Sequence, residues 1–239
     1  MADSRFTFAY IEDQFRQLLA AGYEVLTCAD YVERRAAGTM APLTLVNRID
    51  IDASVKRAER LGDIFARLGI RGSFFVRLHA KEYNPFDFDN YRILRGLIEA
   101  GHEIGYHSEV MDQAVIWSDD PERCLKRDIA VMEAMLERPV RAVASHGGMT
   151  GINNLDFWRE RKAGDFGLAY EAYEEEGAFA LFPRSLYVTD SEWTRWKCYR
   201  DGVRVEGDHR SPAEHAAERP ALIYLLIHSD TYFDRHIYE

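Results

Sequence analysis

The most informative segment of the chain is Leu43-Thr44-Leu45-Val46-Asn47-Arg48-Ile49-Asp50-Ile51-Asp52. It begins as a run of apolar and β-branched residues, which predicts a buried strand. It ends in two carboxylates one residue apart, and residues i and i+2 of a strand point to the same side. We therefore expect Asp50 and Asp52 to face one pocket, where a cation or a hydrogen-bond donor would keep both ionised. A polar strand end followed by a helix cap is the alternative for an isolated Asp-Ile-Asp.

Strands and helices are expected to alternate on both sides of this segment. Apolar residues at a spacing of about 3.6 predict an amphipathic helix from Val55 to Leu68, and residues 72–76 follow as a strand. A strand, a helix and a strand with short connections are typical of a parallel sheet. Further strands are expected at 103–106, 140–144, 186–189 and 222–227. With no repeat or linker in sight, we expect one domain over residues 1–239, with 1–40 as an N-terminal helix-strand-helix extension of it.

Composition argues against several classes of protein. The 239 residues are 47% hydrophobic, enough for a core, and the net charge is 30 − 40 = −10 without a basic cluster. This balance disfavours binding to nucleic acid or to an anionic membrane surface. We expect no secretory signal and no membrane span, because no apolar run approaches the ~20 residues required. The scattered Cys28, Cys124 and Cys198 predict buried free thiols, which suits a cytoplasmic protein.

Five apolar strands each deliver a residue of metal-ligand or acid–base type. The residues are Asp50 with Asp52, His107, His146, Asp190 and His228. The carboxyl ends of parallel strands line one face of an α/β fold, and active sites lie there. Any one of the histidines could be a polar residue at a core edge, but the whole set favours a site. Histidine and aspartate are ligands that zinc prefers, and its catalytic sites keep three protein ligands.

Three segments carry a resemblance to a known family. They are Asp50-Ile51-Asp52, Leu68-Gly69-Ile70-Arg71-Gly72-Ser73-Phe74-Phe75-Val76 and Gly101-His102-Glu103-Ile104-Gly105-Tyr106-His107-Ser108. In this order they resemble the polysaccharide deacetylase (NodB-homology, carbohydrate esterase family four-like) superfamily, from about residue 43 to 229. The N-terminal part is similar to a divergent branch tied to surface-polysaccharide biosynthesis. The resemblance implies an α/β fold, an irregular (β/α)7 barrel, and a metal-dependent hydrolase that removes an N- or O-acyl group from a sugar.

The resemblance also implies roles for individual residues. It assigns the catalytic base to Asp50, metal ligation to Asp52 and His107, and the general acid to His228. Three positions depart from the family pattern. The second histidine of the ligand motif falls at Met111, the arginine-containing third motif is replaced by Ser145-His146-Gly147-Gly148, and the Asp-x-x-Asp-Trp motif is echoed only by Asp190-Ser191-Glu192-Trp193.

The departure at Met111 leaves a third metal ligand to be found. A methionine thioether suits copper better than zinc. His146 ends the strand that follows the one carrying His107, and adjacent strands lie about 4.8 Å apart. We therefore predict that Asp52, His107 and His146 hold a divalent cation, with zinc the expected ion. The alternative is that His146 only hydrogen-bonds substrate and the metal site is lost.

Contacts with substrate are predicted for Arg48, Asp190 and Trp193. Arg48 is either a substrate clamp or the partner that keeps Asp50 ionised, and the indole of Trp193 could stack on a sugar ring. The remaining histidines are expected to be structural, at His102, or solvated, at His79, His209, His215 and His236.

The sequence therefore predicts a hydrolase of a small-molecule or carrier-linked acylated sugar, and a homo-oligomer is compatible with it. Two rivals stay open. One is a non-catalytic carbohydrate-binding or regulatory protein on a decayed deacetylase scaffold, for which Met111 is the main support. The other is a hydrolase of non-sugar C–N bonds, because a fold does not fix its substrate.

Overall fold

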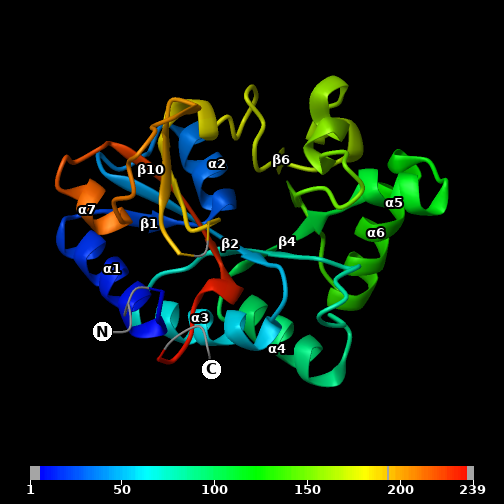
Figure 1. Ribbon diagram of the computed structural model, residues 1–239, viewed down its shortest axis with the longest axis horizontal. Helices are drawn as coiled ribbons and strands as arrows, with labels where there is room; N and C mark the ends of the chain where they lie inside the picture. Colours follow the sequence, from blue (N-terminus) through cyan, green and yellow to red (C-terminus); the bar gives the residue numbers. More distant parts are fainter. Residues whose placement is uncertain (1–5, 193, 236–239) are drawn as a thin grey trace.

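The computed structural model describes residues 6–192 and 194–235, in which strands and helices alternate (Figure 1). The strands are β1 (Glu24–Leu26), β2 (Thr44–Ile51), β3 (Ser73–Val76), β4 (Glu103–Ser108), β5 (Ala142–Ser145), β6 (Tyr170–Glu171), β7 (Leu186–Thr189), β8 (Lys197–Arg200), β9 (Val203–Arg204) and β10 (Leu222–His228). The α-helices are α1 (Phe8–Ala20), α2 (Cys28–Ala37), α3 (Val55–Leu68), α4 (Phe88–Glu99), α5 (Val110–Trp117), α6 (Pro121–Leu136) and α7 (Pro212–Ala216). Short 3₁₀ turns occur in the connections, and among the described helices none is long and apolar enough to cross a membrane.

The strands form one sheet in the order β6-β5-β4-β3-β2-β10-β7-β8-β9. Neighbours from β6 to β7 are parallel, and β8 and β9 continue as antiparallel strands. Strand β1 pairs with the first half of β2, and β3 pairs with its second half, from Arg48 onward. The predicted α/β class and its parallel sheet are confirmed.

The strand pairings of the described residues do not close the sheet into a barrel. They form an open path from β6 to β9. The segment between β6 and β7 is irregular and holds only a short 3₁₀ turn, so it offers no strand to close the ring. Side chains fill this gap instead. The Tyr173 and Tyr187 hydroxyls lie 3.2 Å apart, and the Tyr224 hydroxyl donates to the carbonyl of Ala172 at 3.1 Å. The α/β fold of the predicted irregular barrel is therefore present, while the strand pairings of the described residues do not show its closure into a ring.

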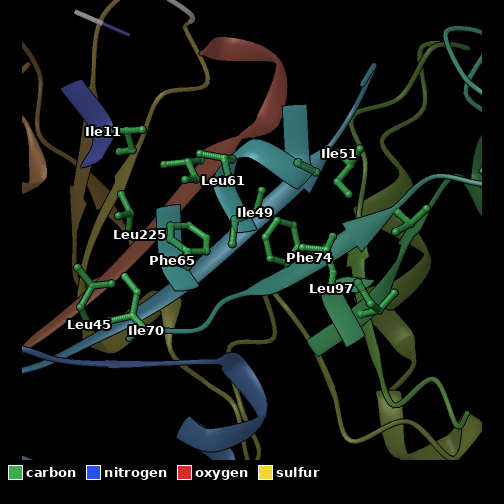
Figure 2. Packing of buried hydrophobic residues seen from close by; sticks show 14 of the residues in the cluster. Ile11, Leu45, Ile49, Ile51, Leu61, Phe65, Ile70, Phe74, Leu97 and Leu225 are labelled. Carbon is green, nitrogen blue, oxygen red and sulfur yellow. The ribbon is translucent and has the colours of Figure 1, made fainter. Parts of the chain in front are cut away.

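The two faces of β2 have different neighbours. Ile49 belongs to the large apolar cluster between the sheet and the helices, where Phe65 and Phe74 also lie (Figure 2). Val46 belongs to the second cluster, inside the curve of the sheet, and Arg48 and Asp50 share its side of the strand. A one-residue slip of register would place the Asp50 carboxylate among the apolar helix-facing side chains. The apolar pattern of β2 thus fixes the direction in which Asp50 points.

A short turn joins β2 to α3 and carries Asp52. The carboxylate of Asp230 accepts the backbone N–H groups of Asp52 at 3.0 Å and Ala53 at 2.8 Å. Helix α3 then begins with Ser54, whose side chain accepts from the N–H of Arg57, and ends at Gly69 with φ of 66°. Hydrogen bonds therefore hold the backbone of the turn at Asp52 and the start of α3, and Asp52 lines the pocket described below.

Candidate active site

The carboxyl ends of β2, β4, β5 and β10 open into one pocket of about 440 Å³. Its lining includes five predicted residues and an aromatic wall: Asp50, Asp52, His107, His146 and His228, with Tyr173, Phe182, Tyr187 and Tyr199. The register explains the convergence, because Asp50 lies directly beside His228 across the β2–β10 pair. His107 pairs with Ala144, two residues before His146.

Asp52, His107 and His146 form a compact group of donor atoms. One potential ligand atom from each residue lies within 4.8 Å of the other two. Nε2 of His107 is 3.3 Å from Oδ1 of Asp52, and the two imidazole centroids are 5.1 Å apart at 84°. The backbone N–H of His146 donates to the carbonyl of Ser108 at 3.0 Å, which ties the turn after β5 to the end of β4.

The orientation of these groups fits a divalent cation. Nδ1 of His107 donates to the carbonyl of Ala144 at 2.8 Å, so in the neutral ring Nε2 presents its lone pair to the pocket. Oδ1 of Asp52 is buried and has no hydrogen-bond partner among the described residues. Nδ1 of His146 lies 3.5 Å from Oε1 of Glu109 and is buried without a hydrogen-bond partner among the described residues. A buried carboxylate oxygen and two imidazole nitrogens are a donor set that zinc accepts.

Arg48 lies behind Asp50 and has no exposed surface. Its Nε donates to Oδ1 of Asp50 at 2.8 Å and a terminal nitrogen donates to Oδ2 at 2.7 Å. The guanidinium also lies 4.5 Å from the ring centre of Tyr173. Of the two roles that the sequence left open, this geometry favours the carboxylate partner over the substrate clamp.

Asp190 has the same relation to His228. Its carboxylate accepts the backbone N–H of His228 at 3.1 Å and lies 2.6 Å from Nδ1 of the ring. Asp190 is fully buried against His228, and its contact with substrate stays a prediction. The third predicted substrate contact, Trp193, lies outside the described residues.

Burial and neighbouring charges shift the pKa values of the titratable groups in the pocket in different directions. Burial disfavours the charged form of Asp50, but Arg48 and His107 outweigh this and lower its pKa. Burial likewise opposes protonation of His228, but Asp190 outweighs it and raises the pKa of His228 to about 9. Burial and the neighbouring His107 lower the pKa of His146 to about 4, so this imidazole is neutral at pH 7. The pocket thus holds an ionised carboxylate, a protonated imidazole and a neutral imidazole.

The sequence alone did not reveal Arg77 and Glu109, which lie behind the group formed by Asp52, His107 and His146. Arg77 donates to the backbone carbonyl of Asp52 at 2.9 Å and pairs with the buried Glu109 at 2.7 Å. The only sequence signal for Glu109 is its place two residues after His107. Met111, at the family's second histidine position, packs on the apolar cluster outside the sheet.

No protein-family model matches the sequence, and no curated protein matches it. Solved structures do match. The Streptococcus pyogenes deacetylase PplD, in complex with acetate, superposes with a TM-score of 0.51 at 12% identity, over 70% of this chain and 72% of that one. The chain has the polysaccharide deacetylase fold. IcaB from Ammonifex degensii matches at 20% identity with a TM-score of 0.44, over 66% of this chain and 74% of that one. A CE4 family pseudoenzyme from Bacillus anthracis matches at 14% identity with a TM-score of 0.43, over 81% and 62%.

Proposed function

We propose that this protein is a metal-dependent hydrolase that removes an N- or O-acyl group from a sugar. The observation that carries the proposal is the convergence of Asp52, His107 and His146 within 4.8 Å of one another. Asp50 and His228 line the same pocket. A sugar-binding surface alone would require neither a carboxylate held ionised nor a histidine held protonated.

Asp52, His107 and His146 would hold the metal. When bound, a divalent cation supplies Lewis-acid polarisation of the acyl carbonyl and makes water more acidic. Zinc is the proposed ion because a carboxylate and two imidazoles are among its usual ligands.

Asp50 is proposed as the general base. Its Oδ2 lies 3.3 Å from Nε2 of His107, so it stands beside the metal-binding group. Arg48 holds both oxygens from behind and keeps the carboxylate ionised. Each carboxylate oxygen has a second lone pair, which can accept a proton from water in the pocket. Arg48 also fixes the orientation of the carboxylate, because two donors in a rigid fork allow a single geometry.

His228 is proposed as the general acid. The bond from Nδ1 to Asp190 leaves Nε2 facing the pocket, 4.0 Å from Oδ2 of Asp52. Its raised pKa keeps the ring protonated at neutral pH, so that it can donate to the departing amine or alkoxide. Asp190 holds the ring in this tautomer and supports its positive charge.

The aromatic part of the pocket lining suits a sugar ring. Tyr173, Phe182, Tyr187 and Tyr199 present aromatic surface to the pocket, and such rings combine an apolar face with polar edges, as sugars do. A volume of about 440 Å³ can take a small acylated sugar, free or as the end of a carrier-linked precursor.

The test measures acetate release from a panel of N- and O-acetylated sugars and sugar nucleotides, by the zinc-loaded protein. Activity in the wild type that is lost in Asp50→Asn supports the proposal. His79→Gln is the control, because His79 lies outside the pocket lining. Saturable sugar binding without acetate release would instead favour the decayed-scaffold rival. Release only from non-sugar amides would favour the hydrolase of other C–N bonds.

A further inference from the structure

A second group of metal-ligand residues lies away from the pocket, where the β8–β9 hairpin meets α7. Cys198 belongs to β8, Asp208 to the loop after β9, and His215 to α7. Cys198 packs with the cluster between the sheet and the helices, whereas its neighbour Tyr199 lines the pocket. Successive side chains of a strand point to opposite faces. The two groups are therefore on opposite sides of the sheet.

His215 is the anomaly in this group. The side chain is 0% exposed, yet neither ring nitrogen has a hydrogen-bond partner among the described residues. An unsatisfied buried donor or acceptor costs about 1–3 kcal/mol. A buried polar group without a protein partner points to a bound water or ion. Both nitrogens are orphaned here, and Nε2 lies 3.7 Å from Oδ1 of Asp208.

The three side chains are arranged as a donor set. One ligand atom from each of Cys198, Asp208 and His215 lies within 4.8 Å of the other two. A thiolate, a carboxylate and a neutral imidazole are all ligands of zinc. The two anionic ligands would balance the charge of a divalent ion, which makes its burial electrostatically acceptable.

A neighbouring arginine orients the carboxylate. Nε of Arg210 donates to Oδ1 of Asp208 at 3.0 Å, and a terminal nitrogen donates to Oδ2 at 2.6 Å. Such partners of a ligand are the usual second layer of a metal site. The backbone N–H of Arg210 also donates to Oδ1 at 3.1 Å, and Nε lies 3.2 Å from Oδ2. Ligation by Asp208 would therefore replace one of these contacts with Arg210.

We propose that Cys198, Asp208 and His215 form a second zinc site, outside the pocket. Cys198 is 1% exposed, whereas the Asp208 side chain is 12% exposed. Water can therefore complete the coordination on the Asp208 side. The bound ion joins the hairpin to α7, whose first turn is already tied to α1 by the N–H of Ala213 donating to Gln14 at 3.1 Å. This site is independent of the proposed hydrolase activity.

Cobalt titration of the full-length protein, stripped of metal, tests the assignment. Cobalt bound to a thiolate gives a thiolate-to-metal charge-transfer absorption, which the pocket group of one aspartate and two histidines cannot give. The band is expected in the wild type and in His146→Ala, and it is expected to be lost in Cys198→Ser. Cys124→Ser removes another buried thiol and is the matched control, which keeps the band. A wild type without the band, or a band that survives in Cys198→Ser, overturns the proposal.

A second measurement tests the proposal even if the Cys198→Ser protein does not fold. Zinc at 100-fold excess over its Kd is expected to raise the Tm of His146→Ala by roughly 5–10 °C, because only the second site remains intact there. The same zinc is expected to leave the Tm of His146→Ala/His215→Gln unchanged. An equal rise in both proteins, or no rise in either, overturns the proposal.

Discussion

Nδ1 of His228 lies 2.6 Å from Oδ1 of Asp190, and the same carboxylate accepts the backbone N–H of His228. The residues come from adjacent parallel strands, β10 and β7, and Asp190 immediately follows its strand. Because Asp190 is fully buried, its charge acts on the imidazole with little screening by solvent. The pair therefore fixes both the tautomer and the charge of the proposed acid.

Asp190→Asn tests this relationship. Asparagine has nearly the same shape and can still accept a hydrogen bond, but it removes the charge that raises the pKa of His228. NMR titration of the metal-free protein should show the His228 ring losing its proton at a lower pH than in the wild type, where the pKa is about 9. An unchanged titration curve in the variant would remove Asp190 as the cause. Turnover at pH 8 should fall as well, because less of the imidazole is protonated.

The acid and base assignments are tested by Asp50→Asn and His228→Ala. Each change should lower turnover by roughly 10²–10⁴-fold, the usual contribution of a general acid or base. Metal content should survive both changes, because neither residue belongs to the proposed ligand group. His79→Gln should keep wild-type turnover. Near-normal turnover in either pocket variant would exclude that residue from the mechanism.

Periodicity was sufficient to predict most of the fold. The buried β2 and the helix α3 follow from an apolar run and a 3.6-residue spacing, and both are observed as expected. The helix α5 was not predicted, because it is short and its apolar residues do not follow one face; Ile116 and Trp117 are exposed. The packing inside the sheet was not predicted, because Tyr173 lies in a segment with no strand pattern, and no sequence pattern indicates its contact with Tyr187 of β7.

The sequence predicts the site residues that directly follow a strand. It does not predict contacts between strands that are far apart in the sequence. His146 could be placed beside His107 because the carboxyl ends of neighbouring parallel strands meet. The burial of Asp190 behind His228 depends on the β7–β10 neighbourhood, which strand order in the sequence does not specify. His215 was expected to be solvated, and this was wrong: α7 packs it against Asp208 with no exposed surface.

The ligand assignment is tested by metal analysis of His146→Ala and Met111→Ala. The first should lose the pocket zinc, because two protein ligands remain where catalytic zinc sites use three. The second should keep it, because Met111 packs on apolar side chains outside the sheet. Both analyses are made in a Cys198→Ser background, so that the pocket alone is counted. One equivalent of zinc in the His146→Ala protein would refute the assignment.

Glu109→Gln tests the support behind His146. Oε1 of Glu109 lies 3.5 Å from Nδ1 of His146, and its other oxygen is buried without a partner among the described residues. Loss of such a carboxylate typically lowers metal affinity by about 10–100-fold. Competition for zinc with a chromophoric chelator measures the change. Glu82→Gln is the matched control, since Glu82 also faces Arg77, at 3.7 Å, but is one-third exposed. Equal zinc affinities in the two variants would argue that Glu109 only neutralises the charge of Arg77.

His102 gives a prediction for stability that does not depend on the proposed function. Its Nδ1 accepts the backbone N–H of Gly72 at 3.1 Å, and Phe74 packs against its ring. Burial, aided by the positive charge of Arg71, lowers the pKa of His102 to about 4. The unfolded chain has a histidine pKa of about 6.5. Between these values the unfolded state binds the proton and the folded state does not, so stability is present above pH 6.5 and is lost as the pH falls toward 4.

Acidification from pH 7 to pH 5 should therefore lower the free energy of unfolding through His102 by about 2 kcal/mol. His102→Asn keeps an acceptor for the Gly72 N–H and does not titrate. Its free energy of unfolding, measured by urea at both pH values, should fall by about 2 kcal/mol less than that of the wild type. Between pH 7 and pH 8, where most of the His102 population is neutral in both states, the difference between the two proteins should change by only about 0.1 kcal/mol. Parallel losses in both proteins from pH 7 to pH 5 would show that another buried group controls the acid response.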